Sequence, residues 1–245
     1  MTERINARMS AVGGVFDMSS ATPRCIGSSS AFGSATTFVT AAHIVAGRRL
    51  DEIAVNHFGH SRHQFSPINE IVVDQHLDAA LLDVVVEEPR WILPFTHALG
   101  AAWYGSEVAS IGWPVDLLAP DADRETLRCF RGYIQRTFLY DPPGRGSYPA
   151  FELSFAAPPG LSGSPVFLVD EPTTLVGIVT ANFSTHSLIE ATEETADTTR
   201  AIQRTEYRSV ITYGIATIAW HVWHAFEDRL PAVALASARQ DQRTG

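Results

Sequence analysis

The sequence predicts an all-β fold, arranged as a sandwich or as a pair of barrels. Short runs rich in Val, Ile, Thr and Phe recur along the chain, and Gly, Pro, Asp and Asn separate them, as in many short strands joined by turns. The chain has 245 residues, a length at which all-β proteins commonly build a sizeable core. Hydrophobic residues make up 45% of it and charged residues 18%, which is a globular composition.

The predicted strands fall into two halves of the chain. The clearest strand covers residues 36–40, and further strands are predicted at 71–73, 81–86, 108–112, 150–155, 165–169 and 175–180. Residues 94–105 read as the connection between the halves. We therefore expect an N-terminal unit at 1–95, a C-terminal unit at 96–230 and a flexible tail at 231–245.

One helix is predicted, over residues 217–230. Apolar residues recur there at helical spacing, at Ala219, Val222, Trp223, Phe226 and Leu230. Pro231 would end this helix, because proline lacks the N–H that the next turn needs.

Residues 183–209 stand out as a long polar connection between strands, with acids at 190, 193, 194, 197 and 206. Connections of this length are usually functional or mobile. Two interpretations stay open: a lid, activation loop or acidic exosite, or a solvated excursion of the surface, since runs of charge are most often solvated.

The net charge and the lack of long apolar stretches limit the classes of partner that we expect. A net charge of −9 argues against wrapping nucleic acid and against an anionic membrane surface, because both need clustered Lys and Arg. No stretch approaches the roughly 20 apolar residues of a membrane span. The first eight residues lack the apolar core of a secretory signal, so we expect a cytoplasmic protein.

The cysteines and one histidine series predict neither a disulfide framework nor a metal site. Cys25 and Cys129 could pair, but two buried free thiols are the better interpretation. His57, His60 and His63 allow a metal site or a polar loop; no cysteine or carboxylate completes a ligand set nearby. We predict no metal and no cofactor.

Three motifs carry candidate chemistry, because a serine nucleophile needs a base, a group that orients the base and donors for the oxyanion. His43 ends the apolar run Thr-Thr-Phe-Val-Thr-Ala-Ala-His, which leaves an imidazole at a strand end; an ordinary core histidine is the alternative. Asp78 opens the apolar run Asp-Ala-Ala-Leu-Leu; alone it also fits a turn, and Asp74 and Asp83 are rival acids.

The third motif is Pro-Gly-Leu-Ser-Gly-Ser-Pro, which places Ser162 between Gly160 and Gly163. Glycine permits a tight turn whose N–H groups point inward, so the N–H groups of Gly160 and Ser162 are the expected oxyanion hole. A plain Gly/Ser/Pro hairpin loop is the alternative.

In the order His43, Asp78, Ser162, these motifs resemble the trypsin-like serine proteases, especially the bacterial HtrA-type and glutamyl-endopeptidase-like branches. The resemblance runs from about residue 10 to residue 228. It implies two six-stranded antiparallel β-barrels with the active site between them and a C-terminal α-helix. It also implies an endopeptidase that acts on protein or peptide substrates. Because Leu161 replaces the aspartate of the trypsin-type zymogen ion pair, a regulatory protein partner that orders residues 183–209 or the oxyanion turn is one option for its control.

Two departures from the family pattern change what is expected. Leu161 stands where trypsin-type enzymes carry the aspartate that binds the new N-terminus, so Val12-Gly13-Gly14 cannot form that ion pair. We therefore predict no zymogen switch of the trypsin type. Ser164 replaces a glycine, a change that should be tolerated.

The resemblance also suggests the pocket for the residue before the cut. Ala156 falls where trypsin carries its acid, and Val179 falls where glutamyl endopeptidases carry a histidine, so neither Arg/Lys nor Glu is expected there. Thr180, Asn182 and Gly214 would line the rest, and a small or medium apolar residue is predicted. The backbone of residues 180–182 would pair with extended substrate. A silent binding module with the same fold is the alternative function.

Overall fold

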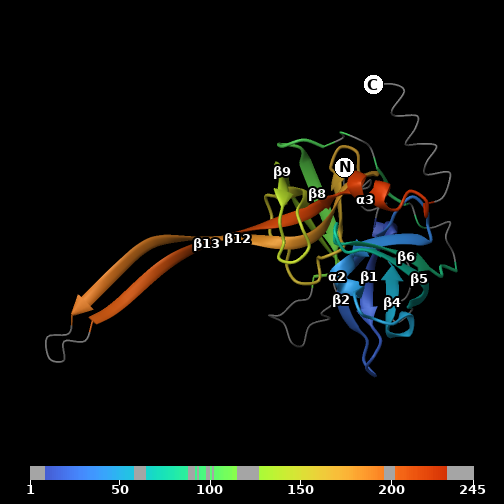
Figure 1. Ribbon diagram of the computed structural model, residues 1–245, viewed down its shortest axis with the longest axis horizontal. Coiled ribbons are helices and arrows are strands. Elements are labelled where there is room, and N and C mark those ends of the chain that lie inside the picture. Colours follow the sequence, from blue (N-terminus) through green and yellow to red (C-terminus); the bar gives the residue numbers. More distant parts are fainter. Residues whose placement is uncertain are drawn as a thin grey trace.

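The computed structural model describes residues 9–57, 65–87, 92, 94–97, 100, 102–114, 127–195 and 202–230, and for 186–195 and 202–209 it describes the backbone alone. Two closed six-stranded antiparallel β-barrels lie next to each other, and a long two-stranded arm projects from the second one (Figure 1). The predicted fold class is therefore confirmed.

The strands cover most of the described chain. They are β1 (Val12–Asp17), β2 (Arg24–Ala31), β3 (Thr37–Ala41), β4 (Ile53–His57), β5 (Ser66–Asp74), β6 (Ala79–Val84), β7 (Thr96–His97), β8 (Glu107–Gly112), β9 (Arg128–Tyr140), β10 (Tyr148–Leu153), β11 (Pro165–Leu168), β12 (Thr174–Thr195) and β13 (Ile202–Ile218). The helices are short: η1 (Met9–Ala11), α2 (Ala42–Val45), η2 (Leu50–Glu52) and α3 (Ala219–Ala225).

The first barrel closes in the order β1-β2-β3-β6-β5-β4. β1, β3 and β6 are buried along nearly their whole length, so both of their faces are covered. Within this barrel β3 pairs antiparallel with β6, and Ala41 lies opposite Ala79. The chain just after β3 and the chain just before β6 therefore meet at one end of the barrel.

The second barrel follows the order β11-β8-β9-β10-β13-β12 and closes through β11–β12 pairing. The two-residue strand β7 adds to it in parallel, beside the start of β12. This strand lies inside the predicted connection at 94–105. The connection is thus partly built into the second sheet, and its residue Phe95 also bridges Phe32 of the first half.

The predicted helix at 217–230 is shorter in the structure. Thr217 and Ile218 complete β13, and α3 spans Ala219–Ala225. The apolar residues of the stripe are nevertheless buried, and Trp223 packs edge-on against Phe32 at 5.3 Å between ring centroids. The helical spacing identified the buried side correctly, but strand pairing with β12 claimed the first two residues.

The predicted polar connection at 183–209 is wrong as a loop. β12 and β13 continue as an antiparallel ribbon well beyond the barrel, with paired residues from Phe183↔Tyr213 out to Thr195↔Ile202 (Figure 1). The ribbon lies outside the core, so no buried face imposes a pattern of apolar residues on its mostly polar sequence. Backbone pairing, not core burial, is what forms this arm.

The structure also bears on the expectations for the cysteines, the histidine series and the residues near the N-terminus. Cys25 and Cys129 are both free, but Cys129 is exposed, so the expected burial of both thiols is wrong for one of them. His57 is buried at the end of β4, whereas His60 and His63 lie outside the described residues. Val12–Gly14 belong to β1, a strand of the first barrel that pairs with β2 and β4.

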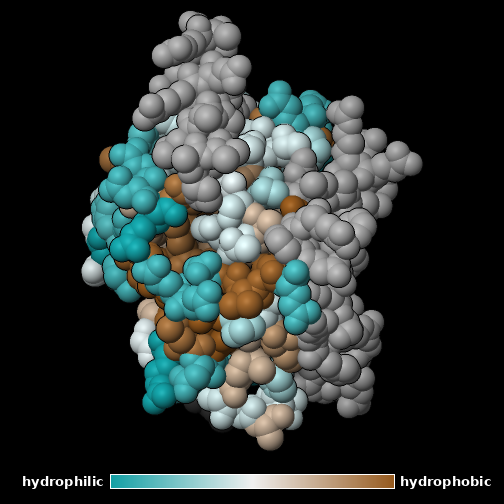
Figure 2. Space-filling model, turned by 90° about the vertical axis from the view of Figure 1, so that its right-hand side faces the viewer, coloured by the Kyte–Doolittle hydropathy of each residue, from teal (hydrophilic) through white to brown (hydrophobic). Residues whose placement is uncertain are grey.

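The face turned away from the arm carries an apolar area near its middle, bordered by polar residues (Figure 2). No helix within the described part of the chain is long and apolar enough to cross a membrane.

Candidate functional site

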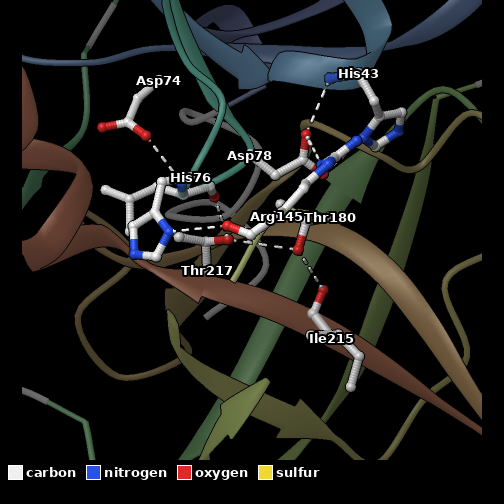
Figure 3. A network of polar contacts seen from close by, with 9 residues as sticks. His43, Asp74, His76, Asp78, Arg145, Thr180, Ile215 and Thr217 are labelled. Atoms are coloured by element: carbon white, nitrogen blue, oxygen red, sulfur yellow. Dashed lines mark hydrogen bonds and ion pairs between the residues drawn. The ribbon is translucent and has the colours of Figure 1, made fainter. Parts of the chain in front are cut away.

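The end of the first barrel joins His43 and Asp78. His43 Nδ1 lies 2.8 Å from Asp78 Oδ2, and the His43 backbone N–H donates to Asp78 Oδ1 at 3.0 Å (Figure 3). The Asp78 side chain is 4% exposed and that of His43 is 33% exposed. A buried carboxylate therefore holds one ring nitrogen, which fixes the imidazole and leaves Nε2 available toward the solvent side.

The backbone of Asp78 has a positive φ of 52°, which is uncommon for a residue other than glycine. Ala42 N–H donates to the Asp78 carbonyl at 3.0 Å, so both the main chain and the side chain of Asp78 contact the segment that carries His43. The rival acids do other work: Asp74 accepts from the Leu77 N–H at 2.9 Å, and Asp83 is exposed and accepts from Asn69. Among the three, Asp78 alone meets the histidine.

A residue that the sequence analysis missed, Arg145, also binds this carboxylate. Its Nη1 lies 2.6 Å from Asp78 Oδ1, and its side chain is 30% exposed. Arg145 comes from the turn between β9 and β10 of the second barrel, and its carbonyl lies 3.2 Å from His76 Nδ1 (Figure 3). No local pattern in the sequence around Arg145 marks it, because the contact depends on how the two barrels meet.

A threonine and tyrosine layer lies beneath Asp78. Thr217 Oγ1 donates to the Leu77 carbonyl at 2.9 Å and lies 3.4 Å from Thr180 Oγ1, which in turn reaches the Ile215 carbonyl at 3.5 Å. Burial raises the pKa of the Tyr148 phenol, against hydrogen bonds with Thr180 and Thr217 that lower it. The tyrosine thus stays neutral and fills the floor under the His43–Asp78 pair.

Ser162 lies in a turn between β10 and β11. Leu161 N–H donates to the Pro158 carbonyl at 3.0 Å, and Gly160 has φ 89°. A positive φ at the third residue with a proline at the second defines a type II turn, because the proline ring excludes a positive φ at its own position. Pro159 and Gly160 are the residues that this turn prefers, so the sequence itself favours its conformation.

Both sides of the serine are held by backbone hydrogen bonds. Ser164 N–H donates to the Leu161 carbonyl at 2.9 Å, and Gly163 N–H donates to the Val179 carbonyl at 2.7 Å. Gly163 has φ 86°, and a Cβ there would collide with the Ser28 carbonyl oxygen and with Thr40 Oγ1. Only glycine allows the serine turn to approach the first barrel this closely.

Ser28 of β2 is the second residue that the sequence analysis missed. Its Oγ donates to the Gly160 carbonyl at 2.8 Å and accepts from the Trp113 N–H at 2.8 Å. Its backbone N–H donates to the Ser162 carbonyl at 2.8 Å, and it is fully buried. Nothing local in the sequence marks Ser28, because the partners of its hydroxyl lie 132 and 85 residues away along the chain.

These contacts place the serine turn against the strand that leads to His43. Ser28 accepts from Thr40 Oγ1 at 2.7 Å, and Thr40 lies three residues before His43 on the chain. No hydrogen bond joins Ser162 Oγ to His43 among the described residues; such contacts are often long in a ligand-free site and shorten in the substrate complex. These hydrogen bonds bring the serine turn next to β3, the strand that ends two residues before His43.

Leu161 and Ser164 occupy the positions where the sequence departs from the family pattern. Leu161 is fully buried in the apolar core of the second barrel, so nothing at this position can bind a charged N-terminus. Ser164 is also fully buried, and a Cβ at Gly112 would collide with its Oγ. The added hydroxyl is accommodated because the facing residue is a glycine.

The predicted pocket residues Ala156, Asn182 and Gly214 lie together. Gly214 N–H donates to the Phe155 carbonyl at 2.7 Å, and Asn182 lies opposite Gly214 in the β12–β13 ladder. The Asn182 side-chain amide binds both backbone groups of Ala157: Oδ1 accepts from its N–H at 2.7 Å, and Nδ2 donates to its carbonyl. Thr180 is buried and its hydroxyl faces Thr217 and Ile215, so its side chain belongs to the layer beneath Asp78.

Comparisons with known proteins agree with this fold. A family model described as a trypsin-like peptidase domain matches residues 27–178, and no curated protein matches the chain. The active form of the Rv3671c protease from M. tuberculosis is 16% identical, with a TM-score of 0.61, and covers 91% of this chain and 82% of its own. The MamO protease domain from Magnetospirillum magneticum is 16% identical, with a TM-score of 0.61 and coverage of 89% and 97%. The HtrA-type protease AlgW, solved with a tripeptide, is 17% identical, with a TM-score of 0.64 and coverage of 94% and 64%.

Proposed function

Because this chain belongs to the trypsin-like peptidase family, we propose that it is a serine endopeptidase that cleaves protein substrates through an acyl-enzyme. Ser162 is the nucleophile, His43 is the general base and Asp78 orients the imidazole. The observation that carries the proposal is the double contact of Asp78 with His43, at 2.8 Å to Nδ1 and 3.0 Å to the backbone N–H.

The reaction follows from the positions of these groups. His43 Nε2 takes the proton of Ser162 Oγ as the oxygen attacks the scissile carbonyl, and the buried Asp78 carboxylate stabilises the imidazolium that forms. The N–H groups of Gly160 and Ser162 bind the oxyanion. His43 then returns the proton to the leaving amine, and a water that it activates releases the product from Ser162.

The type II turn at Pro159–Gly160 supports an oxyanion hole that is formed before substrate arrives. The peptide between Gly160 and Leu161 is held at both ends, by Ser28 Oγ on the carbonyl and by the Pro158 carbonyl on the N–H. Such preorganised donors need no rearrangement during the reaction. Control by a regulatory partner stays a prediction, and it would act elsewhere than on this turn.

The Asn182 amide supports a preference for a small side chain before the cut. It bridges from β12 to Ala157, the neighbour of the predicted pocket base Ala156, and we infer that it limits the room for a long side chain there. No charged residue stands at Ala156, Asn182 or Gly214. We therefore propose alanine, serine or glycine as the residue before the cut. This set is narrower than the small or medium apolar residues that the sequence suggested.

Fluorophosphonate labelling tests the proposal directly. The wild-type protein should be labelled on Ser162, and Ser162→Ala should not, while its far-UV spectrum and melting temperature stay unchanged. Mapping of new N-termini in a proteome treated with wild type or Ser162→Ala then reports cleavage and pocket preference together. Folded wild-type protein that no fluorophosphonate labels, and that creates no new N-terminus, would instead be a binding module with a protease fold.

A further inference from the structure

We propose that the free edge of β12 beyond Asn182, along the arm, continues the substrate pairing expected at residues 180–182 and binds the more N-terminal part of the substrate as a third, antiparallel strand. The arm therefore requires a substrate with at least five residues before the cut, extended along β12. This inference rests on the proposed function, because the arm begins where the substrate pocket ends.

Within the described part of the chain, this edge of β12 has no partner over most of its length. β12 pairs with β13 on one side from Gly177 to Thr195. On its other side it pairs with β7 and β11 only as far as Ile178, and Val179 binds Gly163 and Ser164 of the serine turn. From Thr180 outward, no described residue pairs with this edge. An unpaired strand edge offers a row of N–H and C=O groups to an added strand.

Neighbouring hydrogen bonds decide which residues of β12 face this edge. Gly214 lies opposite Asn182, yet its N–H donates to Phe155 on the far side of β13, at 2.7 Å. The pair Asn182↔Gly214 is therefore one of the pairs that do not exchange hydrogen bonds, so the Asn182 N–H and carbonyl point away from β13. By the same alternation Ser184 points outward, and Phe183 and Thr185 bond to β13.

The free edge is continuous with the pocket. Asn182 binds Ala157, the neighbour of the predicted pocket base, with its side chain and faces the edge with its backbone, and Ser184 lies one strand repeat further along the arm. The principal barrel neighbours of β12, which are β11 and β13, are both antiparallel to it. A substrate strand that continues this pattern runs toward the barrel, so its N-terminal residues lie along the arm.

A further strand would stabilise the arm. A two-stranded ribbon is marginally stable in water, and here it projects from the barrel without packing on it (Figure 1). Phe183, Val210 and Ile211 are 43%, 54% and 48% exposed near its base. Substrate addition supplies main-chain hydrogen bonds and covers part of these side chains, as in other strand-addition complexes.

Substrate length gives the first test. A peptide that wild type cleaves, found in a library of denatured-proteome peptides, is shortened to seven, five or three residues before the cut. Wild type should lose about five- to tenfold in kcat/KM between seven and three residues, as expected for one or two lost hydrogen bonds. Shortening the C-terminal side should show no dependence on the arm.

Two proline variants test which edge of the arm the substrate pairs with. Ser184→Pro removes an N–H on the free edge of β12, and Thr212→Pro removes one on the outer edge of β13. Both lose the Ser184 Oγ–Thr212 Oγ1 contact at 3.0 Å, so they are matched in everything but the edge affected. Ser184→Pro should abolish the gain from three to seven residues, and Thr212→Pro should keep it.

Modified substrate peptides test the inference with the wild-type protein, even if a variant fails to fold. N-methylation of single substrate residues should lower the kcat/KM of the wild-type protein at every second position along residues three to seven before the cut. Equal kcat/KM for long and short peptides, an equal response of the two variants, or no period of two would overturn the inference. Fluorophosphonate labelling of Ser162 separates the two proposals: with labelling intact, such results reject the arm site alone.

Discussion

The two halves of the candidate site are each held by one side chain from the opposite barrel, and the two side chains differ in burial. Arg145 of the second barrel binds the Asp78 carboxylate and is 30% exposed. Ser28 of the first barrel binds the serine turn and is fully buried. A partly exposed ion pair is screened by water, whereas a buried hydroxyl leaves its partners without any replacement. The neutral contact should therefore matter more to activity than the charged one.

Replacement of Ser28 should give the largest effect of this comparison. Ser28→Ala leaves the Gly160 carbonyl and the Trp113 N–H without their partner inside the protein, at a cost of about 1–3 kcal/mol. Because the Gly160 peptide forms the oxyanion turn, kcat should fall about 10- to 100-fold while KM changes little. Fluorophosphonate labelling rates should fall in parallel.

Ser29→Ala is the matched control for Ser28. Ser29 is the next residue of β2, is fully buried and donates to the Gly13 carbonyl at 3.2 Å, away from the serine turn. It should lower the melting temperature and leave kcat unchanged. If both variants lose the same activity, Ser28 acts through general stability and not through the turn.

The pocket offers an intermediate effect, from a contact within one barrel. Asn182→Ala removes the amide that binds Ala157, so side chains larger than alanine should enter. The ratio of kcat/KM for phenylalanine over alanine before the cut should rise about tenfold, the size expected for steric discrimination in a pocket. Ser184→Ala, tested with peptides of three residues before the cut, is the control. An unchanged ratio in Asn182→Ala would show that another residue closes the pocket.

Replacement of Arg145 should give the smallest effect. Arg145→Gln removes an ion pair worth about 1 kcal/mol or less, and Asp78 keeps both contacts with His43. Activity should fall less than about fivefold, with a small drop in melting temperature. Arg131→Gln, which breaks a surface pair with Glu107 at 2.6 Å, should match it in stability without any change in activity. A loss in Arg145→Gln as large as that in Asp78→Asn would reverse the ranking of the two contacts.

The sequence predicted those parts of the site that are local in the chain. His43 and Asp78 were found because each sits at the end of an apolar strand, and the pairing of Ala41 with Ala79 makes those two strand ends meet. The turn at Pro159–Gly160 was found because its residues fix its geometry without help from the rest of the fold. Ser28, Arg145 and the amide of Asn182 act across 25 to 132 residues of chain, where no local spacing can reveal them.

The arm shows most clearly the difference between what the local sequence reveals and what only the tertiary structure reveals. Residues 183–209 carry a polar composition that the sequence could only describe as a connection, because no buried face imposes a pattern on a ribbon that lies outside the core. Composition and motif order by themselves determined the all-β class, the family and the three candidate catalytic residues, since strand periodicity and turn chemistry are written locally. The tertiary structure alone decided how the barrels meet, which contacts hold each half of the site, and that the polar segment is a paired strand with a free edge beside the pocket.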